Sequence, residues 1–517
     1  MYIEPNTIIK VFSYVPIMQN GEHTLIFETL DDQLEYFNSL TPIVFKEHTY
    51  QRVTSNSVRV QKNANAMYGC NYMAFQNTSF GTKWFYAFIE DIKYINNETA
   101  EIIYNIDWYQ SYMTNVVLQE SFVEREHVED DTIGAHTVPE DVDIGELFSD
   151  YTVDKTDTLG VMFWHKENSD LPSDQYKGQF YNNLYSTLKI KAYSRTEDLE
   201  NVINNQVRVY GENDNIVLMC AIPSKCATGT TEHQPKVVEE EFFIPLNNKF
   251  GNYYPSNNKL FTYPYVSCCI DNFNGTTIAL QYELSGHQNN IHLKMLSVPT
   301  PTPSMIMYPK TYKGIPDNYS QGVELTNFPF LPYPSSTFAD WVAQGGVYSA
   351  ITSGISGVNT AMNNMERATH LRAKYKKNMA QRNAMMSAVD SVSDSLISSV
   401  GRYVTSTNIN GSIPNAGIMT ALGKTGFRVS RNILREEYAR IIDGYFTRFG
   451  YKVNELKKPN LFSRSKFNYI KTVDCKVTGN APSIALESIS AMFDNGVTLW
   501  HTPNVHDYSN NTIVIQE

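Results

Sequence analysis

Short runs rich in aromatic and β-branched residues recur from the N-terminus to about Val298, and this pattern limits the possible folds most strongly. The run Trp84–Ile89 is apolar or aromatic at every position, which is typical of a strand buried on both faces. A second run, Glu101–Asp107, follows Asn96 and Asn97, which are residues that favour a tight turn. The sequence therefore predicts a β-hairpin here and a mainly β protein overall.

Segments of different character divide the 517 residues. A chain of this length exceeds a single hydrophobic core, so several domains are expected. We expect an N-terminal β domain over 1–128, a second β domain over 129–298, a proline-rich linker over 299–340, a Gly/Ala/Ser-rich helical insertion over 341–430 and a small α/β part over 431–517. In the last part, helical spacing ends near Gly450, a strand covers Phe467–Val477, and a helix follows Pro482.

The chain is acidic, with a formal net charge of −12. This balance argues against a general nucleic-acid binder, which needs clustered Lys and Arg. The segment Glu120–Asp157 concentrates acidic residues and contains only Arg125 and Lys155 as basic ones. It is either a solvated acidic face or a channel lining that repels the phosphate backbone and lets a duplex slide. The candidates for this acidic lumen or surface are Glu124, Glu126, Glu129, Asp130, Asp131, Glu140, Asp141 and Asp143.

The predicted insertion has two uncharged flanks, Trp341–Met365 and Tyr403–Gly423, around a basic centre. The flanks contain several glycines and can change shape readily. The candidates for a membrane-active loop are Trp341, Val342, Val347, Ile351, Ile355, Val358, Met365, Ile413, Ile418, Met419 and Leu422. The basic centre either contacts lipid headgroups or phosphates, or is the polar face of a surface helix. The candidate headgroup contacts are Arg367, Arg372, Lys374, Lys376, Lys377 and Arg382.

Several functional classes find no support in the sequence. The nucleophile elbow, the phosphate-binding loop and the HExxH motif are absent, and the cysteines form no CxxC pair, so we expect no enzyme, no cofactor and no metal site. No run of about 18 strongly apolar residues predicts a constitutive transmembrane helix. The first residues do not resemble a secretory signal, so synthesis in a cytoplasm is expected.

Three blocks of residues resemble the tail-knob, or distal tail-tube, proteins of the small phi29-like podoviruses of Gram-positive bacteria. The first block comprises Trp84 to Phe88, Ile106, Asp107, Trp108, Met113 and Ser121 to Val128. The second comprises Phe449, Gly450, Tyr451, Lys452, Val453, Pro459, Asn460, Asn468, Tyr469 and Lys471. The third comprises Thr478, Gly479, Asn480, Pro482, Phe493 to Thr498, Trp500, His501 and Thr502.

This resemblance implies a virion structural protein and not an enzyme. It implies a multi-domain, β-barrel-like subunit of a homohexameric tube at the tail tip, attached to the lower collar or connector protein, through which double-stranded DNA leaves without sequence-specific contacts. It also implies a long apolar loop that plugs the lumen and is released to perforate the host membrane. The segment Trp341–Gly423 is similar to that loop in place and composition. The protein is then expected in the virion tail, after synthesis in the bacterial host cytoplasm.

Two other functions remain open at this stage. A tail-associated receptor-binding protein would use aromatic side chains such as Trp164, Tyr253 and Tyr254 to recognise cell-wall polymers of the host. A cell-wall hydrolase would need a pair of facing carboxylates, which a chain with 54 acidic residues always offers in sequence.

Overall fold

Contacts divide the chain into two compact units, each built from segments that are distant in sequence. Unit 1 comprises Met1–Gly145, Gly251–Leu260 and Glu436–Glu517, and unit 2 comprises Glu146–Phe250 and Phe261–Arg435. The computed structural model describes residues 6–48, 56–78, 81, 83–165, 179–181, 184–186, 189–194, 216–227, 234–287, 289–300, 303–326, 328, 330–332 and 424–514.

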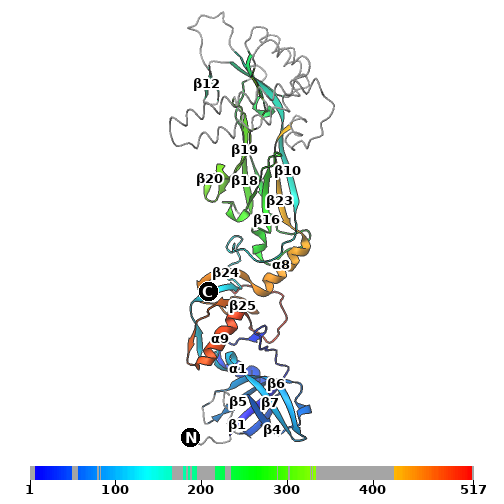
Figure 1. Ribbon diagram of the computed structural model, residues 1–517, viewed down its shortest axis with the longest axis vertical. Coiled ribbons are helices and arrows are strands. Elements are labelled where there is room, and N and C mark those ends of the chain that lie inside the picture. The colour runs from blue at the N-terminus through cyan, green and yellow to red at the C-terminus, as the bar shows by residue number, and fades with distance from the viewer. Residues whose placement is uncertain are drawn as a thin grey trace, which may run out of the picture. The chain divides into compact units, whose positions relative to one another are not determined.

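The first sheet of unit 1 is antiparallel, with the strand order β3-β1-β5-β6-β7-β4 (Figure 1). Its strands are β1 (Thr7–Ser13), β3 (Ile43–His48), β4 (Ser57–Val60), β5 (Cys70–Asn77), β6 (Phe85–Asn96) and β7 (Thr99–Asp107). Strands β6 and β7 form the hairpin that the sequence predicts. Alternate residues of β6 enter two different cores, Tyr86 on one face and Ala87 on the other. The prediction of a strand buried on both faces is confirmed.

Helix α1 (Leu30–Ser39) packs on one face of this sheet. It begins at a capping box, in which the Thr29 side chain accepts from the backbone N–H of Asp32 and the Asp32 carboxylate accepts from the backbone of Thr29. Phe37 of this helix stacks on Tyr72, with ring centroids 5.7 Å apart, and lies 4.6 Å from the ring of Tyr86. The aromatic contacts fix the helix to the sheet.

The second sheet of unit 1 joins the two ends of the chain, in the order β2-β27-β25-β9-β24. Its strands are β2 (Thr24–Leu25), β9 (Ser121–Glu126), β24 (Tyr451–Lys457), β25 (Phe467–Val473) and β27 (Val497–Trp500). A small separate pair consists of β8 (Val116–Leu118) and β26 (Val477–Gly479). Because β9 pairs with both β24 and β25, the C-terminal part does not form a unit of its own, and the predicted boundaries at 128 and 431 are wrong.

Three further helices complete unit 1: α2 (Trp108–Tyr112), α8 (Glu436–Phe449) and α9 (Ser483–Asn495). Helices α8 and α9 confirm the helical spacing before Gly450 and after Pro482. Gly450 ends α8 with φ of +63°, and a Cβ atom there would lie 2.0 Å from the carbonyl oxygen of Glu126. Only glycine fits this turn without displacing backbone.

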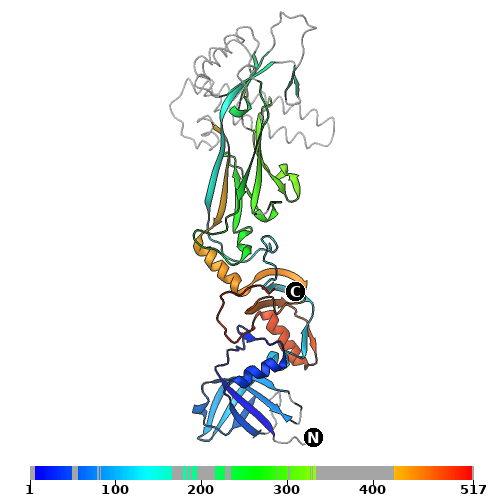
Figure 2. The same cartoon turned by 180° about the vertical axis from the view of Figure 1, so that it is seen from behind.

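The larger sheet of unit 2 has the order β17-β16-β23-β10-β14-β22, with β13 also paired to β10. Figure 2 shows its long strand β10, in cyan, beside β23, in orange. Its strands are β10 (Leu147–His165), β13 (Lys189–Tyr193), β14 (Ile216–Pro223), β16 (Val266–Asp271), β17 (Thr277–Leu280), β22 (Phe330–Pro332) and β23 (Lys424–Leu434). The long β10 pairs with β23 along Leu147–Thr158 and with β14 along Leu159–His165. The predicted boundary at 430 therefore falls inside a strand.

The second sheet of unit 2 corrects the prediction of a linker over 299–340. Its strands are β15 (Val238–Pro245), β18 (Asn290–Val298), β19 (Ser304–Tyr312), β20 (Ile315–Asp317) and β21 (Val323–Leu325), and a separate hairpin joins β11 (Gln179–Tyr181) to β12 (Leu184–Ser186). Pro309 is tolerated in β19 because one edge of that strand pairs with β21 up to Met307 and with β20 only from Lys310. The carbonyl of Pro309 still accepts from the N–H of Asn318 at 3.0 Å.

Arg431 pairs with a carboxylate in its own sheet and also donates a hydrogen bond to the other sheet of unit 2. The guanidinium of Arg431 on β23 donates to both carboxylate oxygens of Asp150 on β10, at 2.8 and 2.7 Å. A third N–H of the same group donates to the carbonyl of Pro245 on β15. The planar fork of arginine satisfies both partners at once, so this contact sets the separation of the sheets.

Candidate functional site

The predicted acidic segment does not form one uniform surface. Glu126 is 2% exposed, the Glu140 side chain is fully buried, and Asp131 is partly buried, so these three are not free acidic surface groups. The others lie at the surface or partly exposed in unit 1: Glu124, Glu129, Asp130, Asp141 and Asp143. Their placement around a lumen stays a prediction.

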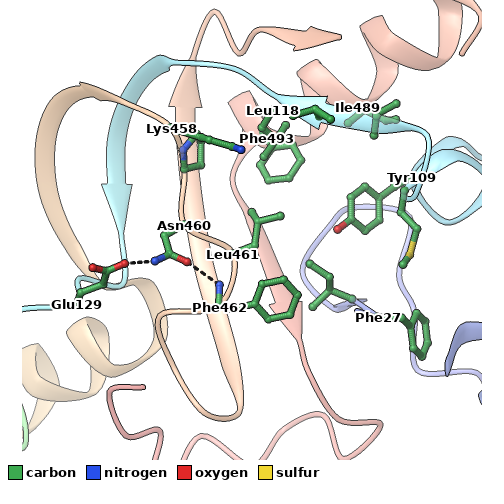
Figure 3. Close-up of a pocket in the computed structure, with 15 residues that line it drawn as sticks. Phe27, Tyr109, Leu118, Glu129, Lys458, Asn460, Leu461, Phe462, Ile489 and Phe493 are labelled. Atoms are coloured by element: carbon green, nitrogen blue, oxygen red, sulfur yellow. Dashed lines mark hydrogen bonds between the residues drawn. The ribbon is translucent and has the colours of Figure 1, made fainter. Parts of the chain in front are cut away.

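Most of the exposed carboxylates make local contacts. Glu129 accepts from the side-chain amide of Asn460 (Figure 3). Asp130 accepts from the backbone N–H of Thr132 at 2.8 Å, and this contact and that of the Thr132 hydroxyl lower the pKa of the Asp130 carboxyl. Asp143 accepts from the N–H of Gly145 at 2.9 Å, and Glu124 and Asp141 pair with lysines at 2.8 and 3.1 Å. They are available to solvent but carry no reactive arrangement.

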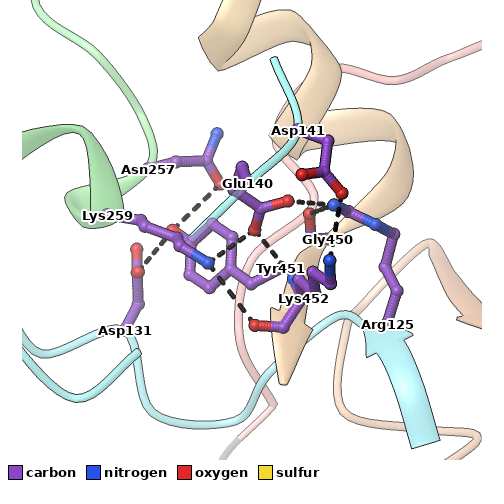
Figure 4. A network of polar contacts seen from close by, with 9 residues as sticks. All are labelled: Arg125, Asp131, Glu140, Asp141, Asn257, Lys259, Gly450, Tyr451 and Lys452. Atoms are coloured by element: carbon purple, nitrogen blue, oxygen red, sulfur yellow. Dashed lines mark hydrogen bonds and ion pairs between the residues drawn. The ribbon is translucent and has the colours of Figure 1, made fainter. Parts of the chain in front are cut away.

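Glu140 lies at the centre of a buried polar cluster in unit 1 (Figure 4). Its carboxylate pairs with the guanidinium of Arg125 and with Nζ of Lys259, the latter at 2.5 Å, and accepts from the backbone N–H of Lys452 at 2.8 Å. Arg125 also donates to the carbonyl of Gly450 at 2.7 Å. We call Arg125, Glu140, Lys259, Gly450 and Lys452 the Glu140 cluster. Two buried cations around one carboxylate leave each ion paired, as burial of charge requires.

The segment Gly251–Leu260, which contains Lys259 of the Glu140 cluster, is also held by Asp443 of α8. Its buried carboxylate accepts from the hydroxyl of Tyr253 at 2.5 Å and from the backbone N–H groups of Ser256 and Asn257 at 2.9 and 3.0 Å. The side-chain amide of Asn257 adds a further bond at 2.8 Å. Each acceptor in this arrangement is satisfied by donors of the same unit, which points to architecture and not to chemistry.

His127 is a buried neutral imidazole in the middle of unit 1. Its Nδ1 accepts from the backbone N–H of Tyr469 at 2.8 Å, and its Nε2–H donates to the carbonyl of Thr447 at 3.1 Å. Burial, the main cause, and the nearby Arg464 guanidinium lower the pKa of His127 to about 3. The ring therefore ties β25 and α8 together as long as it stays neutral.

No arrangement in the described part of the chain fits a metal site. Across those residues, no group of three His, Cys, Asp or Glu side chains is placed to hold a metal ion. The six cysteines are free thiols, and burial raises the pKa of Cys220 and Cys268 well above the ordinary value. Within the same residues, no helix is both long and apolar enough to cross a bilayer.

The predicted membrane-active loop and its basic centre lie outside the described residues. This holds for every candidate from Trp341 to Leu422 and from Arg367 to Arg382. The strands on either side are described, and they belong to one sheet. Pro332 of β22 is aligned with Leu218 of β14, which is aligned with Trp164 of β10, while Lys424 of β23 is aligned with Thr158.

A receptor-binding surface needs exposed aromatic side chains, and two of the three aromatic residues considered for that function are buried or bonded within the chain. Trp164 lies in β10 and is 6% exposed, so it does not reach a polymer. Tyr253 donates its hydroxyl to Asp443. Only Tyr254, 62% exposed, is available at the surface.

The three blocks noted in the sequence come together in unit 1. Arg125 and Glu126 of the first block contact the second block through Gly450, and β25 of the second pairs with β27 of the third. Gly496 of the third block lies against Tyr469 of the second, because a Cβ atom there would lie 2.3 Å from the Tyr469 hydroxyl. The recognised residues are thus the contact points of one structural unit.

This mainly β architecture is that of a phage tail knob. The solved structure of the bacteriophage C1 tail knob protein gp12 matches with a TM-score of 0.60 over 98% of this chain and 100% of that chain, at 15% identity. The chain belongs to the family of the Bacillus phage phi29 tail knob protein gp9, whose C-terminal domain profile matches residues 233–512. Residues 5–117 match the N-terminus of the caudoviral major tail protein.

Curated relatives match along nearly their whole length. The tail knob proteins gp9 of Bacillus phages PZA and B103 are each 24% identical, over 97% and 98% of this chain and 98% of each relative. The phi29 protein is 23% identical over 97% of this chain. The chain is therefore a structural component of a phage tail, located in the virion.

Sequence reasoning missed several residues of the buried clusters. Lys259, Asn257 and Asp443 carry no local signal, because their partners lie more than a hundred residues away in sequence. Gly450 belongs to a recognised block and was the one available indication of a close backbone contact.

Proposed function

We propose that copies of this chain form a hexameric tail-knob tube that conducts the genome during ejection, with the segment 341–423 as a loop that first plugs the lumen and then perforates the host membrane. The observation that supports the loop most directly is the register of the larger sheet in unit 2. Strand β22 runs parallel to β10 and leads into the segment, while β23 runs antiparallel to β10 and leads out of it. The described residues that flank the segment, Pro332 and Lys424, are therefore both aligned with the half of β10 that ends at His165.

At the opposite end of the β10–β23 pair, Leu147 is aligned with Leu434. The flanking residues Pro332 and Lys424 are aligned with Trp164 and Thr158 of β10, respectively. At about 3.3 Å per residue and about 4.8 Å per strand, Pro332 and Lys424 are roughly 25 Å apart. An insertion anchored in this way can rearrange without disturbing the strand pairs that hold unit 2.

The proposed mechanism uses the composition of that segment. Packed Gly, Ala and Met surfaces from several copies would occlude the lumen and hide apolar area, which water penalises by roughly 25 cal/mol per Å². Release would offer the same area to host membrane lipids. The basic centre Arg367–Arg382 would add about 1 kcal/mol for each residue that reaches an anionic lipid surface.

The remaining parts of the proposal concern DNA and the tail. In a symmetric assembly each exposed carboxylate of the acidic segment becomes a ring of charge, which would keep double-stranded DNA from adhering during passage. The knob would attach to the lower collar or connector protein of the tail. Both partners are part of this proposal, and the exposed carboxylates of unit 1 are compatible with passage of DNA.

A loop replacement tests the membrane role. We expect the intact protein to release dye from anionic vesicles at neutral or acidic pH, and a variant with 341–423 replaced by a Gly/Ser linker to release none. A linker of about 20 residues spans roughly 25 Å on average, which matches the distance between Pro332 and Lys424.

A second variant, in which all six basic residues from Arg367 to Arg382 are changed to Gln, keeps the apolar flanks. Its leakage of anionic vesicles should fall to the level that it shows on neutral ones. Full leakage by the linker variant, or none by the intact protein, contradicts the membrane role.

A further inference from the structure

Unit 1 contains an open, mostly apolar pocket of about 570 Å³. Phe27, Leu461, Phe462 and Phe493 form much of its wall (Figure 3). This volume lies in the range of sites that hold a small ligand or a few side chains of a partner. Of the acidic candidates, Glu129 is among the residues that line this pocket, and the proposed tube and loop give the pocket no role.

The hydroxyl of Tyr109 points into this pocket without a hydrogen-bond partner in the described part of the chain (Figure 3). The residue itself is 6% exposed, and its ring packs edge-on against Phe493 at 6.2 Å. The pocket is open, so this hydroxyl is available to solvent or to a polar atom of an occupant.

One wall of the pocket is strand β8, and its outer edge is open. The N–H of Asn480 donates to the carbonyl of Asn115 and the N–H of Gln119 donates to that of Lys476, which makes these the hydrogen-bonded pairs of the β8–β26 ladder. By the alternation of an antiparallel ladder, Val116 and Leu118 direct their N–H and C=O groups away from β26. Within the described residues these groups have no backbone partner. An open strand edge of this kind is a template for another strand.

The rim of the pocket carries a cation that is not in an ion pair. Lys458 is exposed, and none of the ion pairs among the described residues includes it. Glu129, on the same rim, is already bonded to Asn460. A carboxylate on the occupant would therefore meet an available partner at Lys458.

We propose that this pocket binds an extended peptide segment of a partner protein, added as a strand to the free edge of β8. Apolar side chains at alternate positions of the peptide enter the pocket, and an acidic residue near one end pairs with Lys458. The open backbone edge favours a peptide over a lipid or a detergent, because only a peptide offers donors and acceptors at strand spacing.

Synthetic octapeptides test this proposal on the full-length protein. The probe is an end-blocked peptide with Leu or Val alternating with Thr and one Asp near its end, measured by fluorescence anisotropy. We expect it to bind at least tenfold more tightly than a peptide of the same composition in which the apolar residues are consecutive. Methylation of two alternate backbone nitrogens should weaken binding about tenfold, since each removes a strand hydrogen bond.

Variants connect the binding to the pocket. Lys458→Gln should weaken the Asp-containing peptide severalfold and leave a peptide with Asn at that position unchanged, whereas the matched variant Lys476→Gln, on the β26 side of the ladder, should change neither. Tyr109→Phe should weaken both peptides to a similar extent. Equal binding of the alternating and consecutive peptides, no effect of backbone methylation, or oleate as the better ligand would each overturn the proposal.

Discussion

We expect the substitution Glu140→Gln to destabilise unit 1 by about 3–5 kcal/mol, because it removes one partner of a buried ion group. The neutral amide leaves the two cations Arg125 and Lys259 without a counter-charge in a site where the side chain of residue 140 is fully buried. The backbone N–H of Lys452 also loses its charged acceptor. Chemical denaturation of the purified chain measures this difference as a shift in the unfolding midpoint of unit 1.

The neighbouring residue provides the control for this experiment. Asp141→Asn removes the same charge from a side chain that is 93% exposed and that contacts only Lys452, at 3.1 Å. Exposed pairs contribute about 0–1 kcal/mol, so this variant should unfold nearly as the wild type does. Equal effects of the two substitutions would mean that the Glu140 cluster does not hold unit 1 together.

The second large effect concerns pH and His127. The pKa of this imidazole is about 3 in the folded state, against an ordinary value near 6.5. Between these values the unfolded chain binds more protons than the folded one, so the contribution of His127 to stability falls as the pH falls. The slope is at most about 1.4 kcal/mol per pH unit, beginning near pH 6.5.

The variant His127→Asn isolates this contribution. Its side-chain oxygen can still accept from the N–H of Tyr469, but it does not titrate. Other buried groups shift in the opposite sense, for example Asp107, whose pKa burial raises to about 6, and they are present in both proteins. We expect the stability advantage of the wild type to shrink by roughly 2 kcal/mol between pH 7 and pH 5. Parallel pH profiles of the two proteins would show that His127 is not the titrating group.

Local patterns predicted the elements that depend on local sequence. The β6–β7 hairpin follows from apolar runs around Asn96 and Asn97, and α9 follows from the spacing after Pro482. These elements form from neighbours in the chain, so periodicity and turn residues are sufficient to find them. The mainly β class follows from the same runs.

The division into units could not be predicted in this way. Strand β9 pairs with β24 and β25, more than three hundred residues later, and Lys259 pairs with Glu140, which lies 119 residues earlier in the sequence. Hydrophobic periodicity says nothing about which distant strands become neighbours. Proline frequency was equally misleading over 299–340, because Pro309 occupies a position in β19 whose missing N–H needs no partner.

In the acidic segment, too, the local sequence predicted the composition but not the contacts with distant residues. Charge density indicated that Glu120–Asp157 is either a solvated acidic face or a channel lining, but charge density does not distinguish an exposed carboxylate such as Asp141 from a buried one such as Glu140. Burial depends on Arg125 and Lys259, whose approach requires the complete fold. The three blocks of residues that resemble the tail-knob family predicted contacts of unit 1 better than charge density did, because their residues contact one another there.

The most direct test of the account is an electron micrograph of the purified protein, or of isolated tails, averaged without imposed symmetry. We predict rings of six copies around an open axis wide enough for double-stranded DNA, closed by a plug in the intact protein and cleared when 341–423 is replaced by the linker. Monomers, or oligomers without an axial channel, would contradict the proposal that this chain forms the tube of a tail knob.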